Sequence, residues 1–280
     1  MPDSQFHLVF CDVGQGDAVL VKYKNLQALI DGGPSGQSVS ECLSKNIPPW
    51  DRELELLVLT HPDDDHLTGL IDVIKKYNVR QIVVNSLIKE SGAFWQFRQE
   101  VLAESALIYS PQAGDQLKLG PLVINILWPK EKLGDDRVWQ KNYLVSSETS
   151  QLTPEDSQIL GVATVKQESN EVSIVMQLLF GDFQVLLPGD IGSGSENQID
   201  FPNVEVLKIP HHGSRYSTSA ELLQESSPEL AIISVGKNSF GHPTDEVLEK
   251  LQASGIKTLR TDREGEIEIV SDGKKWGIKK

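Results

Sequence analysis

Three short loops hold five of the six histidines of this 280-residue chain, and each loop directly follows an apolar run. The five are His61, His66, His211, His212 and His242. Core histidines would not be expected to gather at the ends of predicted strands. Because loops at one edge of a sheet bring distant parts of a chain together, this distribution predicts a single site built on a sheet edge.

Apolar periodicity predicts the elements around these loops. The predicted strands cover residues 6–10, 18–23, 26–30, 54–60, 79–84, 106–109, 116–119, 122–128, 172–180, 183–187, 204–209, 230–235, 266–270 and 275–278. The predicted helices cover residues 67–77 and 93–104 and begin near residues 217 and 245. Strands and helices are mixed without a clean interior boundary, so we expect one α+β domain over residues 1–280, with a polar excursion at about 130–169.

Composition and the N-terminus favour a soluble protein. A chain with 39% hydrophobic residues can bury a sizeable core, and its longest apolar runs fall short of a membrane span. The N-terminus lacks a signal peptide's basic cluster and apolar core, so we expect a cytoplasmic protein without a membrane span. Cys11 and Cys42 lack metal-type spacing, and buried free thiols are favoured over a disulfide.

The formal net charge of −14 bears on possible partners. Proteins that bind nucleic acid without sequence preference usually present a basic surface, because they displace the cations condensed on phosphates. Lys208, Arg215, Lys237 and Arg260 lie in or near the histidine loops and form either a local basic strip or ordinary solvated surface. The sequence carries no signal for an oligomeric state.

The stretch THPDDDHLTGL, residues 60–70, has three consecutive carboxylates between two histidines, directly before a predicted helix. The acids alone are equally typical of a solvated loop that favours the helix's positive end. Together with the other histidines and with Asp190, however, they favour a metal site, because divalent first-row cations accept imidazole nitrogen and carboxylate oxygen. Three buried carboxylates without a cation would be costly.

Several motifs resemble a known family. Residues 61–66, HPDDDH, resemble the His-x-His-x-Asp-His signature of the metallo-β-lactamase superfamily, with Asp63 in place of the second histidine. The motifs DVGQGD (12–17), LIDGG (29–33), LPGD (187–190), LKIPHHGS (207–214), residues 234–243 and residues 260–262 resemble the soluble hydrolase domain of ComEC-type DNA-uptake proteins. The resemblance runs from about residue 6 to about residue 265 and implies an αββα four-layer sandwich.

The resemblance also implies two divalent ions, Zn²⁺ or Mn²⁺, and hydrolysis by a metal-bound hydroxide. Carried over by position, Asp65 and His66 hold one ion with His242, and His61 and Asp63 hold the other. The bridging ligand is Asp190. The remaining assignments are His211 as the general acid with His212 as its competitor, Gly213 and Ser214 at a phosphate oxygen, Asp12, Gln15 and Asp17 lining or bracing the site, and Asp31 as a carboxylate partner of a ligating histidine.

Two departures from the family pattern leave alternatives open. Residues 67–210 contain no histidine where the superfamily usually has a further ligand, so the first ion position is weak or empty unless Asn170 or Glu171 contributes. Asp63 is a hard oxygen donor, which favours Mn²⁺ beside or instead of Zn²⁺. A phosphodiesterase or nuclease acting on single-stranded DNA is the first hypothesis. A hydrolase of small esters, lactones or cyclic phosphodiesters and a metal-free binding module are the alternatives.

Overall fold

The computed structural model describes residues 3–141 and 169–279 of the chain. Most of the polar excursion predicted at about 130–169 lies outside these residues. The described start of that segment contains the short 3₁₀ helix η1 (Asp136–Trp139), whose Val138 and Trp139 are buried in the core. Among the described residues, no helix has both the length and the apolar character needed to cross a bilayer.

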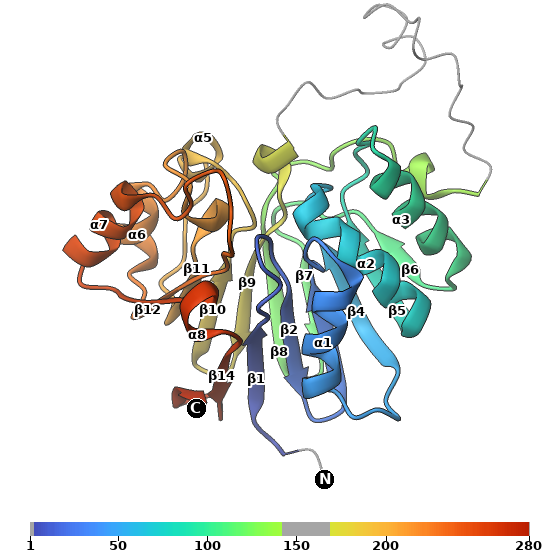
Figure 1. Cartoon of the computed structure of the whole chain (residues 1–280), viewed down its shortest axis with the longest axis horizontal. Coiled ribbons are helices and arrows are strands. Elements are labelled where there is room, and N and C mark those ends of the chain that lie inside the picture. Colours follow the sequence, from blue (N-terminus) through green and yellow to red (C-terminus); the bar gives the residue numbers. More distant parts are fainter. Residues whose placement is uncertain (1–2, 142–168, 280) are drawn as a thin grey trace, which may run out of the picture.

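The strands form two sheets (Figure 1). The first sheet has the order β15 (Trp276–Lys279), β14 (Ile267–Ser271), β1 (Phe6–Phe10), β2 (Val19–Tyr23), β3 (Leu26–Ile30), β4 (Glu53–Leu59), β5 (Asn78–Val84) and β6 (Leu107–Tyr109). The second has the order β13 (Lys257–Arg260), β12 (Leu230–Ile233), β11 (Val206–Lys208), β10 (Phe183–Leu187), β9 (Val175–Phe180), β8 (Leu122–Trp128) and β7 (Gln116–Leu119).

Helices cover the outer face of each sheet. The first sheet carries α1 (Gly36–Asn46), α2 (Asp64–Lys76) and α3 (Gly92–Ala103), and the second carries α6 (Ala220–Ser226) and α7 (Asp245–Ala253) (Figure 1). The short helices α5 (Ser193–Glu196) and α8 (Thr261–Glu264) and the 3₁₀ helices η3 (Ser169–Val172) and η4 (Pro210–Gly213) lie in connections.

Strand alternation explains the layers. Successive side chains of a strand point to opposite faces, so a central strand contributes to two cores. In β10, Val185 and Leu187 pack between the two sheets, whereas Leu186 packs beneath the helices of the second sheet. In β1, Leu8 lies between the sheets and Val9 faces the helices of the first sheet. The predicted αββα sandwich is therefore confirmed.

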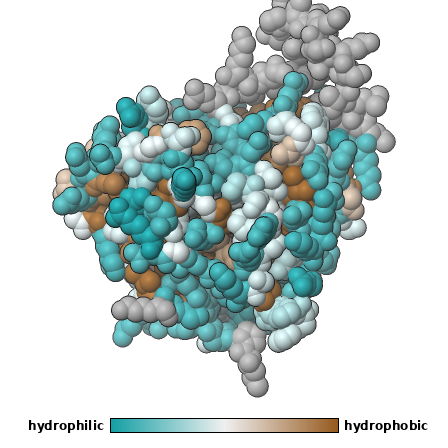
Figure 2. Space-filling view, in the orientation of Figure 1, coloured by the Kyte–Doolittle hydropathy of each residue, from teal (hydrophilic) through white to brown (hydrophobic). Residues whose placement is uncertain are grey.

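Parallel strands place the functional loops at one edge. The strands β3 to β6 are parallel, and so are β10 to β13. The histidine loops follow the carboxyl ends of β4, β11 and β12, which is where open α/β sheets form their ligand sites. On the face of the molecule that Figure 2 shows, the surface is mostly hydrophilic with scattered apolar side chains.

The prediction of free thiols was wrong. Cys11, directly after β1, forms a disulfide with Cys42 of α1, and their Cα atoms lie 5.8 Å apart. Both cysteines are buried among the apolar residues shared by the first sheet and its helices. Periodicity did not reveal the pair because it did not predict α1, whose packing against the sheet brings together cysteines that are 31 positions apart.

Candidate metal centre

The loop from β4 to α2 places His61 and His66 side by side. The carbonyl of Asp63 accepts the backbone N–H groups of His66 (3.0 Å) and Leu67 (2.9 Å), which starts the helix, and the acids of the first turn favour its positive end. His66 therefore lies in the first turn on the buried face of α2. The rings of His61 and His66 lie 4.1 Å apart, between their centroids.

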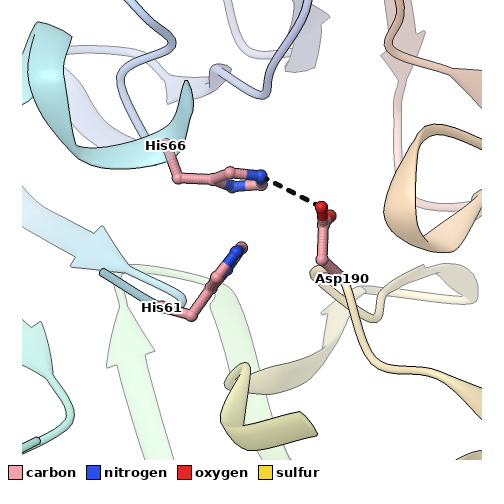
Figure 3. Close-up of side chains that lie close together, drawn as sticks. All are labelled: His61, His66 and Asp190. Atoms are coloured by element: carbon pink, nitrogen blue, oxygen red, sulfur yellow. Dashed lines mark ion pairs between the residues drawn. The ribbon is translucent and has the colours of Figure 1, made fainter. Parts of the chain in front are cut away.

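The turn after β10 brings Asp190 to the same place (Figure 3). Gly189 has a left-handed backbone (φ 59°), and a Cβ there would lie 2.7 Å from the Cβ of Ser173, so the turn requires glycine. The backbone N–H of Asp190 donates to the hydroxyl of Ser173 (3.1 Å). Its buried carboxylate places Oδ2 3.3 Å from Nε2 of His66, the ion pair drawn in Figure 3.

His212 reaches the centre from η4. Its Nδ1 donates to the carbonyl oxygen of Ser234 (2.8 Å), and its Nε2 lies 3.2 Å from Oδ2 of Asp190 and 3.4 Å from Oδ2 of Asp65. His211 (φ 49°) and His212 (φ 53°) both adopt the left-handed conformation. Such a conformation is costly outside glycine and is concentrated at functional sites.

The donor atoms fit a divalent cation. In the described part of the chain, the Nε2 atoms of His61, His66 and His212 are buried without a hydrogen-bond partner. Ligand atoms lie within 4.8 Å of one another in the groups His61–His66–Asp190, Asp65–His66–His212, Asp17–Asp190–His212 and Asp17–Asp31–His66. Imidazole nitrogen and carboxylate oxygen are the ligands that zinc and manganese accept.

The hydrogen bonds behind the rings leave each Nε2 free to bind. Nδ1 of His66 donates to Oδ2 of Asp31 (2.8 Å), the contact expected for that carboxylate. The hydroxyl of Thr60 gives its single proton to Asp31 (2.7 Å), so its 3.1 Å contact with Nδ1 of His61 makes the ring nitrogen the donor. In His212, Nδ1 is held by a carbonyl oxygen. In its neutral form, each of the three rings therefore presents an Nε2 lone pair to the centre.

The pKa values of the buried histidines and aspartates support the same assignment. Burial favours neutral His212, but Asp190 and Asp17 raise the pKa of His212 to about 10. Burial alone would raise the pKa of Asp190, yet His212 and His66 hold that pKa well below its ordinary value. Burial and His66 lower the pKa of His61 to about 3. The protons on the imidazoles offset the negative charge of the carboxylates. A divalent cation bound to these groups would replace those protons and offset the same charge.

Lys208 belongs to this buried cluster, although the sequence analysis expected it at the protein surface. It does not belong to a basic surface strip, because its side chain is buried and forms ion pairs with Asp17 and with Oδ1 of Asp190 (3.3 Å). The signal was its position at the end of an apolar strand, directly before the histidine turn. Arg260 of the expected strip pairs with Asp262 (2.6 Å).

Two expected ligands lie apart from these groups. Oδ1 of Asp63 accepts hydrogen bonds from Lys89 (2.6 Å) and Ser169 (2.5 Å), and its Oδ2 lies 3.7 Å from Nε2 of His61. The ring of His242 lies 5.5 Å from that of His211 and belongs to none of the four groups. The structure therefore brings His212, rather than His242, to Asp65 and His66.

The other expected residues line or brace the surrounding loops. The ring Nε2 of His211 lies 3.2 Å from the amide nitrogen of Asn170, whereas the carboxylate of Glu171 accepts from Ser195 (2.5 Å). Asp12 accepts the backbone N–H of Gly14 (3.3 Å).

Gln15, Gly213 and Ser214 hold the loops to one another. The side chain of Gln15 accepts the backbone N–H of Gly236 (3.5 Å). The carbonyl of Gly213 accepts from Thr244 (2.9 Å), and the buried hydroxyl of Ser214 accepts the backbone N–H of Tyr216 (3.4 Å). The contacts of Gly213 and Ser214 brace the turn that carries His212.

Proteins of similar sequence identify the family. A family model described as "Metallo-beta-lactamase superfamily" matches residues 11–237. The chain is 28% identical to "ComE operon protein 3" of Bacillus subtilis (strain 168), covering 92% of this chain and 32% of the relative. It is 27% identical to "Recombination protein 2" of Haemophilus influenzae, covering 92% and 28%. The chain thus spans about a third of the length of these relatives.

A solved structure has the same fold. The metallo-beta-lactamase fold protein YhfI from Bacillus subtilis superposes with a TM-score of 0.56 at 13% identity, covering 94% of this chain and 99% of the other. That identity supports the fold alone. Because the family model matches most of the sequence, the chain belongs to the metallo-beta-lactamase superfamily of hydrolases.

Proposed function

We propose that the chain is a metal-dependent phosphodiesterase that acts on single-stranded DNA. The observation that carries the proposal is the convergence of three buried Nε2 atoms on the carboxylates of Asp65 and Asp190. The names of the relatives add support for DNA, since one of them refers to recombination. Carboxylate oxygens and imidazole nitrogens are donor atoms that both Zn²⁺ and Mn²⁺ accept.

The proposed ligands are His66, His212, Asp65 and Asp190 for one ion, with His61 and Asp63 toward a second, weaker position. Asp63 binds weakly in this proposal because one of its oxygens is already held by Lys89 and Ser169. Divalent cations at such a site supply Lewis acidity, which polarises a phosphoryl oxygen and makes water more acidic. His242 is an alternative ligand, although loop rotation would be needed to bring its ring to the cluster.

His211 is the proposed proton donor to the departing alkoxide. Its competitor His212 has Nδ1 committed to a carbonyl oxygen and Nε2 facing two carboxylates, so a ligand role leaves it no proton to transfer. Burial lowers the pKa of His211, and a bound phosphodiester would raise that pKa again because it is anionic. Gly213 and Ser214 keep their proposed place beside the phosphate.

The test is hydrolysis of single-stranded DNA and of bis(p-nitrophenyl) phosphate with added Mn²⁺ or Zn²⁺. Asp190→Asn and His66→Ala should each lower kcat/KM by more than about 10-fold, because even the loss of a residue that only orients a metal ligand costs roughly 10- to 100-fold. Asp182→Asn, which changes an exposed carboxylate in the turn at the other end of β10, should act as wild type. Full activity of folded Asp190→Asn would refute the proposal.

A second candidate is a hydrolase of small esters, lactones or cyclic phosphodiesters. The net charge of −14 favours it, because a net negative charge disfavours the approach of a polyanion. Activity on such compounds with inert single-stranded DNA would decide for it.

The cytoplasmic location expected from the sequence stays a prediction. The disulfide between Cys11 and Cys42 counts against it, because such bonds persist mainly in oxidising compartments. Thiol titration of the freshly isolated protein would show whether the bond forms where the protein works.

A further inference from the structure

The loop from β12 to α7 presents a large aromatic side chain to solvent beside the metal centre. Phe240 is 70% exposed, although its neighbours Ser234 and Val235 at the start of the same loop are buried. A phenylalanine kept in water gains nothing from the hydrophobic effect in the free protein. The Phe240 side chain is therefore a candidate for contact with a partner that has an apolar or aromatic surface.

Asn238 fixes the backbone that carries this ring. Its amide nitrogen donates to the carbonyl oxygens of Gly236 (2.9 Å) and His242 (2.8 Å). Its amide oxygen accepts the backbone N–H groups of Phe240 (3.0 Å) and His242 (3.1 Å). Because the loop is already ordered by these four hydrogen bonds, a ligand that contacts Phe240 loses little free energy to ordering it.

A row of rings connects Phe240 to the metal centre. The ring of Phe240 stacks on His242 at 5.8 Å between centroids, with an interplanar angle of 29°. His242 lies 5.5 Å from His211, and His211 lies 6.3 Å from His212. Phe240 is thus the outer end of an aromatic row whose inner end, His212, faces the carboxylates of the centre.

Two cations lie in the loops that carry this row. Arg215 lies two positions after the turn that carries His211 and His212, and Lys237 directly precedes Asn238; both are exposed. Positive side chains beside exposed aromatic rings are the combination that binds single-stranded nucleic acid, in which bases stack on rings and phosphates contact cations. The position of these cations is notable in a chain whose net charge is −14.

We propose that Phe240, backed by the ring of His242, is a stacking platform for a nucleobase of the substrate, with Arg215 and Lys237 contacting the phosphates on either side. The platform selects single-stranded nucleic acid over phosphodiesters that lack a base. This inference rests on the proposed phosphodiesterase function and adds the residue that determines its substrate class.

The test measures the coupling between the ring and the base. The metal-loaded full chain is assayed on oligothymidylate and on an abasic oligonucleotide of the same length, which has the same phosphates and no bases. Wild type should prefer oligothymidylate in kcat/KM by roughly 5- to 150-fold, the effect of stacking one base. Phe240→Ala should remove most of this preference, and Phe240→Trp should retain it.

Trp50→Ala is the matched control. Trp50 is 85% exposed and precedes β4, whereas the metal centre follows that strand, so the variant removes an exposed ring far from the site and should keep the wild-type preference. An unchanged preference in Phe240→Ala, or no preference in wild type that still cleaves both oligonucleotides, would overturn the stacking platform alone. A wild type that cleaves neither would overturn the proposed function and the platform together.

Discussion

Asp31→Asn is the perturbation that examines the hydrogen bonds behind the metal ligands. The carboxylate is buried and accepts the backbone N–H of Thr60 (2.8 Å), the hydroxyl of Thr60 (2.7 Å) and Nδ1–H of His66 (2.8 Å). Asparagine has the same shape and tolerates the left-handed backbone of this position (φ 58°). The substitution therefore changes the chemistry of the hydrogen bonds with little change in the backbone.

The amide that Asp31→Asn introduces places a donor where the site needs an acceptor. If the amide oxygen keeps the bond to the backbone N–H of Thr60, the amide nitrogen faces Nδ1 of His66. His66 then has to move its proton to Nε2, which is the atom that faces Asp190 and would bind the metal. Loss of such an orienting partner costs roughly 10- to 100-fold in metal affinity, or about 1.4–2.8 kcal/mol.

The assay is competition between the protein and a chelating fluorophore for Zn²⁺ and for Mn²⁺. Circular dichroism and thermal unfolding in the presence of a chelator would show that Asp31→Asn is folded. Asp51→Asn is the control, since Asp51 accepts from the side chain of Gln27 (2.8 Å) ahead of β4, away from the centre. A folded Asp31→Asn that binds either metal as tightly as wild type would refute the orienting role of this carboxylate.

Three further predictions concern stability. Lys208→Met should lower the free energy of unfolding in chelator by about 3–5 kcal/mol, because it leaves two buried carboxylates without their ammonium partner; an unchanged urea midpoint would contradict this. Joint replacement of Cys11 and Cys42 by serine should cost about 3.7 kcal/mol, the loop entropy for a separation of 31 residues, and a reductant should then leave the variant's urea curve unchanged. Burial raises the pKa of Glu196 in the folded state above its value in the unfolded state. The protonated Glu196 side chain therefore contributes fully to the free energy of unfolding below the unfolded pKa, and this contribution is lost as pH rises through the folded pKa. The stability of wild type relative to Glu196→Gln should therefore fall in urea titrations as pH rises above the ordinary pKa of 4.5, and a pH-independent difference would count against it.

The fold was predictable where burial leaves a clear pattern. The strands β1, β3, β7, β8 and β10 have the predicted bounds, because central strands need continuous apolar runs and edge strands alternate. The helix α1 was missed, since its apolar residues Val39, Cys42 and Leu43 are few among polar neighbours. The edge strand β13 was missed as well, because none of its four residues is fully buried.

The candidate site was predictable in its residue types but not in its pairings. The signature at 61–66 and the turn at Asp190 could be recognised because their spacing along the chain is local. The choice between His212 and His242 depends on the left-handed backbone of η4, and the burial of Lys208 depends on the packing of β11. Neither property has a signature in hydrophobic periodicity, so the structure was needed to find them.

The most direct measurement is the metal content of the chain purified without chelators, combined with phosphodiester hydrolysis after chelation and after return of Mn²⁺ or Zn²⁺. We expect about two ions per chain at saturation, with activity that is lost with the metal and recovered with it. A folded chain that takes up no divalent ion under these conditions would contradict the central claim that the buried histidines and aspartates form a metal centre.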